Sequence, residues 1–280
     1  MTGPPAAFDA CMPSPDGVLC FRLTTGGALD HVAAQIRTQG LAEYEAPAPA
    51  VIAGLVQEVP GLVLDIGANT GVYALLAAAA HPQARVVAFE PLDPARALLL
   101  ANIACNPSVA FRIRTEPLAL SRARSTAVFY ETINDAGLVS TSSSLELSHA
   151  AQVGRYVERR AATETLDGWA ESAGVEDIAL MKIDVEGHEH AVIEGGRGVL
   201  ARHRPFVVAE FLGPANFAWL NGALAEAGYL DFALYRDGLR RCPSLRFHPE
   251  AWNHLLCPAE RTGQLAAVCE RLGLGFGAGE

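Results

Sequence analysis

From Gly61 onward, short apolar runs alternate with longer stretches in which apolar residues recur every three or four positions. Runs of the first kind predict strands buried on both faces, and the longer stretches predict helices. Their alternation predicts βαβ units and a mostly parallel sheet. The expected strands are Leu62–Ile66, Arg85–Glu90, Val109–Arg114, Ile178–Asp184 and Phe206–Phe211, and the expected helices are Gly71–Ala80, Pro94–Asn106, His188–Ala201 and Asn216–Ala227.

Two regions depart from this rhythm. Residues 1–58 are expected to form a preface to the main domain of residues 59–280, and residues 121–165 are expected to be an insertion around a polar loop at 140–144. Further strands are expected at Gly17–Leu23, Ala127–Tyr130, Tyr156–Thr163, Tyr229–Tyr235 and Leu239–Phe247, and further helices at Leu29–Thr38 and Ala48–Val59. Long insertions in α/β domains often shape a substrate pocket, so the preface and the insertion are expected to cover one.

The composition narrows the choice of partners and compartment. Half of the residues are hydrophobic and the formal net charge is -10, which indicates a large core and argues against nucleic acid as a partner. No apolar run is long enough to cross a bilayer, and the first twelve residues lack the features of a signal peptide. The six cysteines are scattered without a C-x-x-C pair. They predict buried thiols in a reducing compartment, and therefore a cytoplasmic protein.

The first predicted strand leads into a glycine-containing turn, which lies where open α/β sheets bind ligands. The residues of this turn that we assign to a cofactor are Asp65, Gly67, Ala68, Asn69 and Gly71. The spacing is G-x-N-x-G, whereas the G-x-G-x-x-G fingerprint brings a helix N-terminus against a pyrophosphate. A carboxylate at the strand end would repel a pyrophosphate, but it suits the sulfonium and ammonium groups of S-adenosylmethionine. The turn therefore favours S-adenosylmethionine over NAD; a tight turn that binds no ligand is the alternative.

Glu90 stands at the end of the second predicted strand, 25 positions after Asp65. A carboxylate accepts two hydrogen bonds from a ribose diol, and adjacent strands open onto the same crevice. Glu90 is therefore predicted to bind the ribose, with capping of the following helix as the alternative. Apolar side chains are expected to hold the adenine, and the segment Glu116–Leu120 is the candidate to read its edge.

The fourth predicted strand carries Lys182 and Asp184 on one face. Both are costly to bury unless they are paired, and Lys182 is the single lysine of a chain rich in arginine, which favours a slot for a compact ammonium group. His188 follows at the start of a helix, whose positive end keeps an imidazole neutral and able to accept a proton; a surface histidine among capping acids is the alternative. The cluster lacks H-E-x-x-H, so no metal ligand is assigned, and Mg²⁺ on Asp184 is not favoured.

Taken together, these segments resemble the FkbM-type methyltransferases. The matching runs are Val63–Gly71, Phe89–Pro91, Thr165–Asp167, Met181–Glu189, Arg204–Pro205 and Val208–Glu210. The resemblance implies a Rossmann-like class I methyltransferase fold with a mostly parallel seven-stranded sheet and helices on both faces. It also implies S-adenosyl-L-methionine as cofactor and O-methylation of a sugar or secondary metabolite, in natural product biosynthesis.

By position, the resemblance places Asp65, Gly67 and Gly71 at the methionyl part of the cofactor and Glu90 at the ribose. Lys182, Asp184 and Glu186 belong to the signature after the fourth strand. We assign Asp184 to both the cofactor and the catalytic set, together with His188 and Lys182, because an alcohol needs a base as the methyl group is transferred. The expected acceptor is a small molecule or glycoside. N- or carboxyl-methylation, an NAD-binding oxidoreductase and a non-catalytic S-adenosylmethionine-binding module stay open.

Overall fold

The computed structural model describes residues 7–26, 30–133, 139, 141–213 and 215–278. The N-terminal elements are β1 (Ala7–Ser14), β2 (Gly17–Thr24), α1 (His31–Gln39) and α2 (Ala48–Glu58). They are followed by β3 (Leu62–Ile66), α3 (Val72–Ala80), β4 (Arg85–Phe89), α4 (Asp93–Ala104), α5 (Pro107–Ala110), β5 (Ile113–Glu116), β6 (Ala119–Leu120), β7 (Ser125–Thr132), α6 (Leu147–Val153) and β8 (Tyr156–Glu164).

The second half of the chain continues the alternation of helices and strands. Its elements are α7 (Leu166–Ser172), β9 (Leu180–Ile183), α8 (Glu189–Gly195), α9 (Arg197–His203), β10 (Phe206–Glu210), α10 (Phe217–Glu226), β11 (Tyr229–Tyr235), β12 (Gly238–Cys242), β13 (Asn253–Pro258), the 3-10 turn η1 (Ala259–Arg261), α11 (Thr262–Leu272) and β14 (Gly275–Ala278).

The main sheet has the order β14-β12-β11-β13-β10-β9-β3-β4-β5. The five strands from β5 to β10 pair in parallel, whereas β13 pairs antiparallel with both β10 and β11. The expected α/β fold with a large, mostly parallel sheet is thereby confirmed. Within the described part of the chain the sheet has nine strands instead of the expected seven, because β12 and β14 extend it beyond β11.

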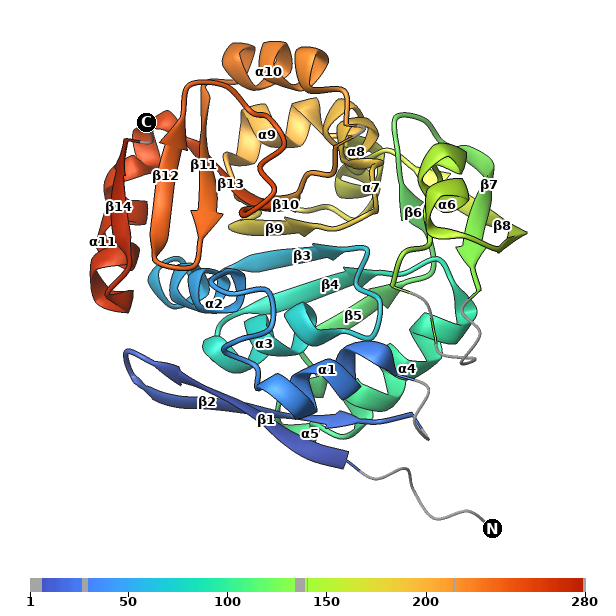
Figure 1. Cartoon of the computed structure of the whole chain (residues 1–280), viewed down its shortest axis with the longest axis horizontal. Helices are drawn as coiled ribbons and strands as arrows, with labels where there is room; N and C mark the ends of the chain where they lie inside the picture. The colour runs from blue at the N-terminus through green and yellow to red at the C-terminus, as the bar shows by residue number, and fades with distance from the viewer. Residues whose placement is uncertain (1–6, 27–29, 134–138, 140, 214, 279–280) are drawn as a thin grey trace.

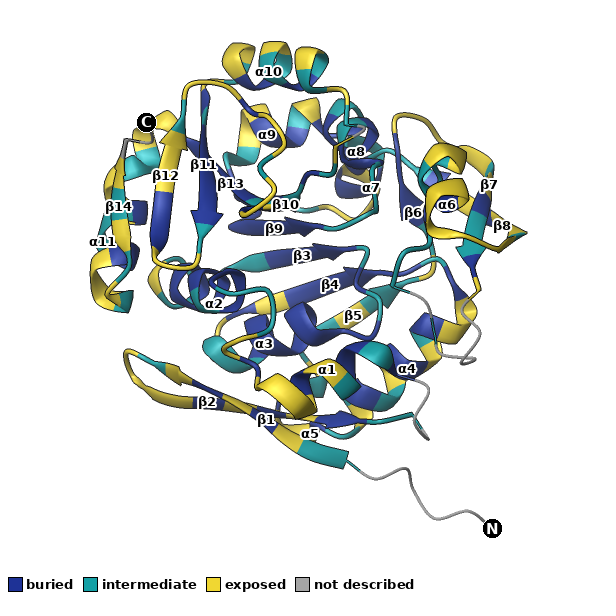
Figure 2. Ribbon diagram, in the orientation of Figure 1, coloured by how far each residue is buried: buried dark blue, intermediate teal, exposed yellow. Residues whose placement is uncertain are grey.

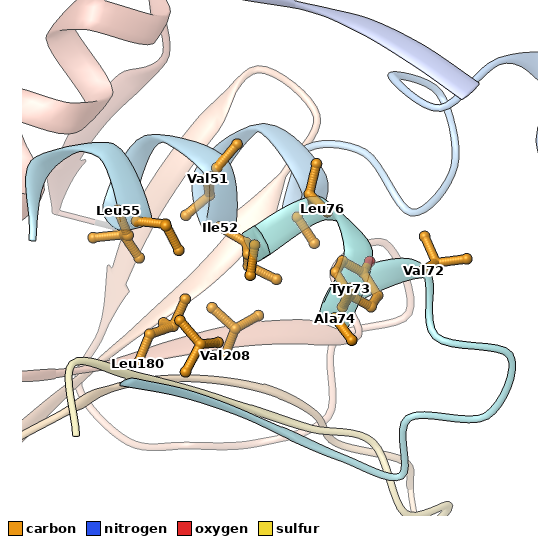
Figure 3. Close-up of a cluster of buried hydrophobic side chains, with 14 of the residues drawn as sticks. Val51, Ile52, Leu55, Val72, Tyr73, Ala74, Leu76, Leu180 and Val208 are labelled. Atoms are coloured by element: carbon orange, nitrogen blue, oxygen red, sulfur yellow. The ribbon is translucent and has the colours of Figure 1, made fainter. Parts of the chain in front are cut away.

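Helices cover both faces of this sheet (Figure 1). Successive strand residues point to opposite faces, and Val63 and Leu64 accordingly belong to two different hydrophobic clusters. Figure 3 shows the cluster on one face, where side chains of α2 and α3 approach Leu180 of β9 and Val208 of β10. The other cluster joins the sheet to α7, α8, α9 and α10, and Figure 2 shows the central strands as buried.

The N-terminal segment packs against the main domain. Its helices α1 and α2 and the inward face of the β1–β2 hairpin belong to the same hydrophobic cluster as α3. The strand expected at Gly17–Leu23 is present as β2, and its partner β1 was not expected. Cys11 and Cys20 face each other across this hairpin and form a disulfide. The prediction of six thiols was therefore wrong for this pair, and the cysteines no longer support a reducing compartment.

Three predicted elements differ from the structure. The strand expected at Val109–Arg114 begins at Ile113, because Pro107–Ala110 forms a short helix whose first position suits proline. The helix expected at His188–Ala201 is divided at Gly196 into α8 and α9. The strand expected at Leu239–Phe247 ends at Cys242, and β13, which was not expected, lies between β10 and β11.

The insertion forms a small sheet of its own. Strands β7 and β8, which contain both expected strands, pair antiparallel over eight residues each, and β6 adds a third strand. Part of the expected polar loop, residue 140, lies outside the described residues. Helix α6, between β7 and β8, lies beside the loop that follows β9, where His149 is 3.2 Å from the carboxylate of Glu186.

Candidate functional site

A cavity of about 400 Å³ lies at the carboxyl ends of β3, β4, β9 and β10. Parallel strands place these ends at one edge of the sheet, where α/β folds bind ligands, and the volume is in the range of small-molecule pockets. The preface contributes lining residues from His31 to Glu45, and the insertion contributes Thr141, Ser143 and Leu145. Both segments expected to cover a pocket therefore line this one.

The turn after β3 brings the backbone close to the cavity. Gly67 has a φ of 82°, and a Cβ atom there would lie 1.8 Å from the carbonyl oxygen of Asp184. Only glycine fits this contact. Asn69 also has a positive φ, of 47°, and Gly71 is a left-handed residue at the start of α3, packed against Leu99. Gly67 and Asn69 line the cavity, whereas Ala68 and Gly71 do not line it and belong to the turn alone.

Glu90 follows β4 and lines the cavity opposite this turn. One carboxylate oxygen accepts a hydrogen bond of 2.9 Å from the backbone N–H of Asn69, and the other accepts one of 2.8 Å from Leu92. Burial raises the pKa of Glu90 to about 7, against the lowering effect of these two bonds. Each oxygen retains a lone pair for a further donor, so Glu90 is fixed in place and can still bind a diol.

Asp65 lies behind the turn and does not line the cavity. Its side chain is 2% exposed, and it stands beside Lys182 in the β3–β9 register. Burial raises its pKa to about 7, with Lys182 acting in the opposite direction. Asp65 therefore supports Lys182 and is not placed for the direct contact with a ligand that the sequence had suggested.

Lys182 and Asp184 form the expected pair. Lys182 Nζ lies 3.0 Å from Asp184 Oδ2 and 3.5 Å from Asn253 Oδ1, and 5.2 Å from the ring centroid of Tyr73. The lysine side chain is 1% exposed and lies beneath the cavity, whereas Asp184 is 23% exposed and lines it. Burial lowers the pKa of Lys182, but the carboxylates of Asp184, Glu45 and Glu210 outweigh this effect and raise it.

Three further carboxylates share this end of the cavity, namely Glu45, Glu186 and Glu210. Glu45 accepts a hydrogen bond of 2.7 Å from the Tyr73 hydroxyl. Burial and the charge of Asp184 raise the pKa of both Glu186 and Glu210. Four carboxyl groups thus line the cavity near one ammonium group, and this acidic wall favours a cationic ligand.

His188 lines the cavity from the loop after β9. Its Nδ1 lies 2.6 Å from Oε1 of Glu146, and its Nε2 lies 2.9 Å from Oγ of Ser121. Both partners belong to the insertion, and the side chain is 9% exposed. His188 is therefore an enclosed residue of the site and not a surface histidine.

Several residues of the site had no assigned role from the sequence. Glu45 comes from the preface and Glu146 from the insertion, whereas Asn253 begins β13 and Trp252 directly precedes it. Their positions depend on contacts between distant segments, for which the sequence holds no spacing signal. Glu210 is the last residue of Val208–Glu210, one of the runs that carry the family resemblance. This match was the sequence feature that could have placed Glu210 in the site.

The segment Glu116–Leu120, expected near the adenine, is divided in the structure. Leu118, Ala119 and Leu120 line the cavity beside Pro91 and Leu92. Glu116 does not line it: its carboxylate lies near Arg114 and accepts a 3.4 Å hydrogen bond from Trp169. The apolar part of the segment is therefore at the cavity.

Among the described residues, no three His, Cys, Asp or Glu side chains are arranged to hold a metal ion. Within the same ranges, no helix is both long and apolar enough to span a bilayer.

The buried carboxyl groups predict an inverse dependence of stability on pH. Asp65, Glu90 and Glu189 each have a pKa raised to about 7 by burial. Between pH 4.5 and 7 the folded protein therefore retains protons that the unfolded chain has released, so stability falls as pH rises. We expect urea denaturation to give a free energy of unfolding lower by at least about 1 kcal/mol at pH 8 than at pH 6. Replacing Glu90 by Gln should flatten this slope, and a stability that rises over the same interval would contradict the assignment.

Comparison with known proteins agrees with this geometry. A family model described as "Methyltransferase FkbM domain" matches residues 65–249, which is well over half of the chain. The 2-O-methyltransferase NoeI of Sinorhizobium fredii is 30% identical over 168 residues, which cover 57% of this chain and 67% of NoeI. The chain therefore belongs to the FkbM family of methyltransferases.

Other similarities are shorter or lower in sequence identity. A segment of 50 residues, 18% of this chain, is 52% identical to the AMB antimetabolite synthetase AmbE of Pseudomonas aeruginosa, of which it spans 2%. The solved structure of an FkbM methyltransferase from Methylobacillus flagellatus KT is 15% identical, with a TM-score of 0.44, over 69% of this chain and 42% of that one. An S-adenosylmethionine-dependent O-methyltransferase from Thermotoga maritima is 10% identical, with a TM-score of 0.40, over 88% and 77% of the two chains.

Proposed function

We propose that this protein transfers a methyl group from S-adenosyl-L-methionine to a hydroxyl group of a small-molecule or glycoside acceptor. The observation that carries the proposal is the carboxylate of Glu90, which two backbone N–H groups fix at the cavity with lone pairs to spare. A ribose diol is the ligand group that such a carboxylate suits.

The other residues of the cavity fit the rest of this cofactor. The acidic wall around Asp184, Glu45 and Glu210 suits its sulfonium and ammonium groups, and the apolar residues Leu118 and Leu120 suit an adenine ring. Gly67 lets the backbone approach the ligand, with Asn69 beside it. When bound, the cofactor supplies a methyl group already activated on a positively charged sulfur.

An acidic cavity argues against the NAD alternative. Asp184 and Glu45 would repel a pyrophosphate, which needs N–H donors or cations. Transfer to an amine remains a second candidate, since carboxylates also attract an ammonium group. We favour a hydroxyl acceptor because NoeI, the 30% identical relative, is a 2-O-methyltransferase. A role in natural product biosynthesis draws support from the short match to an antimetabolite synthetase.

The protein's task in this reaction is to align the acceptor and remove its proton. Lys182 holds Asp184 by one carboxylate oxygen and leaves the other for an acceptor hydroxyl or the cofactor. Trp252 is at the rim of the cavity and 51% exposed. Its ring is fixed by a 2.8 Å hydrogen bond from its N–H to the carbonyl of Pro249, which leaves an aromatic face for a sugar or another acceptor. We propose that the preface helices and the insertion cover the bound ligands.

Calorimetry against S-adenosylhomocysteine and against NAD tests the cofactor. We expect binding of S-adenosylhomocysteine alone, and a weakening of about 10- to 100-fold in Glu90→Gln, because a charged acceptor of hydrogen bonds is lost. Glu116→Gln is the matched control, since Glu116 ends the next strand, β5, but does not line the cavity. Binding of NAD alone, or equal affinities in the two variants, would refute the proposed cofactor site. A screen of hydroxylated metabolites with labelled donor then identifies the acceptor.

A further inference from the structure

His188 lies between two side chains of the insertion, Glu146 and Ser121, that differ in whether they can donate a hydrogen bond. Glu146 has its pKa lowered, chiefly by its hydrogen bond with His188, so its side chain is an ionised carboxylate at neutral pH. A carboxylate can only accept hydrogen bonds, whereas the hydroxyl of Ser121 can donate or accept. At 2.6 Å from Glu146, Nδ1 of the imidazole must carry the proton. In the neutral ring, Nε2 therefore holds the lone pair and accepts from Ser121 at 2.9 Å.

Glu146 is itself fixed beside the loop after β9. Two positions earlier, the hydroxyl of Ser144 contacts the carbonyl oxygens of Glu186 at 2.8 Å and Val185 at 3.2 Å. His149, one turn later on α6, lies 3.2 Å from the carboxylate of Glu186. Glu186 has a φ of 56°, a backbone conformation that persists in non-glycine residues only where the surroundings impose it. The segment from Ser144 to His149 therefore fixes the position of the loop that carries His188.

We propose that Glu146 is a positioning residue that keeps His188 in the Nδ1–H form, so that Nε2 is the base of the methyl transfer. The inference rests on the proposed function. An acceptor hydroxyl takes the place of the Ser121 hydroxyl and gives its proton to Nε2. The acceptor oxygen forms its bond to the methyl carbon as the carbon–sulfur bond breaks and its electron pair goes to sulfur. The carboxylate of Glu146 stabilises the resulting imidazolium. This arrangement of base and orienting acid is the one that activates nucleophiles in other enzymes.

Nitrogen NMR of the full chain labelled with ¹⁵N-histidine tests the assignment directly. At a pH where the ring is neutral, we expect His188 to show a protonated Nδ1 and an unprotonated Nε2, with its signals identified from the variant His188→Gln. In Glu146→Gln the amide can also donate to Nδ1, so the Nε2–H form should become substantially populated. Glu146→Asp retains the carboxylate and should restore the Nδ1–H form. Glu131→Gln, in the same insertion but paired with Arg159, should leave His188 unchanged.

Turnover and cofactor binding separate this inference from the proposed function. With an acceptor from the screen, Glu146→Gln should lower kcat by about 10²-fold or more, the usual contribution of a general base, and leave the affinity for S-adenosylhomocysteine within twofold. If wild-type protein does not bind S-adenosylhomocysteine, the proposed function fails. If it binds, but His188 keeps the same form in Glu146→Gln or already carries its proton on Nε2 in the wild type, only the role of Glu146 is overturned.

Discussion

Replacing Lys182 by methionine is expected to lower the free energy of unfolding by about 3–5 kcal/mol at pH 8, the usual cost of removing one partner from a buried ion pair. Methionine matches the length and apolar stem of lysine, but it leaves Asp184 without its 3.0 Å partner. Glu45, whose charge also acts on the ammonium group, loses its counterion as well. Urea denaturation of the two proteins at the same pH measures the loss.

An exposed ion pair provides the control for this substitution. Arg236 pairs with Glu43, and both side chains are more than half exposed. Arg236→Met should therefore change stability by less than about 1 kcal/mol. The effect of Lys182→Met should also shrink at pH 6, because Asp65, whose pKa is raised to about 7 and whose charge Lys182 stabilises, then holds its proton. If Lys182→Met lowers the free energy of unfolding by less than about 1 kcal/mol at pH 8, the buried carboxylates of the site do not need this lysine as their counterion.

Local sequence patterns were sufficient for the central strands. Leu62–Ile66 is bounded as expected, and Arg85–Glu90 differs by one residue, because a strand buried on both faces leaves a continuous apolar run that ends in a polar residue. The pairing of Lys182 with Asp184 was also predicted, since alternation along a strand places residues two apart on one face. In these cases a short stretch of chain is enough to predict where the strand lies and which of its side chains share a face.

Features that depend on distant segments could not be predicted in this way. Strand β13 enters the sheet between β10 and β11, although it follows both in the chain, and no local period encodes such an order. The same holds for Glu146, which meets His188 across 42 positions. Cys11 and Cys20 have ordinary spacing for unrelated cysteines, and only the hairpin register places them opposite each other.

The turn after β3 gives the second large prediction, because Gly67 leaves no room for a side chain. In Gly67→Ala the new methyl group would lie 1.8 Å from the carbonyl oxygen of Asp184 and 2.8 Å from its carbonyl carbon. These contacts are backbone atoms, which cannot move aside as the end of a flexible side chain can. The positive φ of 82° is itself unfavourable for alanine. We expect a loss of about 3 kcal/mol or more in the free energy of unfolding, measured by urea denaturation.

The same substitution should also abolish binding of S-adenosylhomocysteine in calorimetry. The end of β9 must move away from β3 to accommodate the methyl group, and it carries Asp184, whose N–H donates to the carbonyl of Ile66 at 2.9 Å. The cavity wall that faces the ligand would move with it. Gly222→Ala is the control, because a Cβ atom on this exposed residue of α10 meets nothing and alanine stabilises a helix by about 0.5–1 kcal/mol. If Gly67→Ala folds normally and binds the ligand within threefold of wild type, the close approach of these two strand ends does not shape the site.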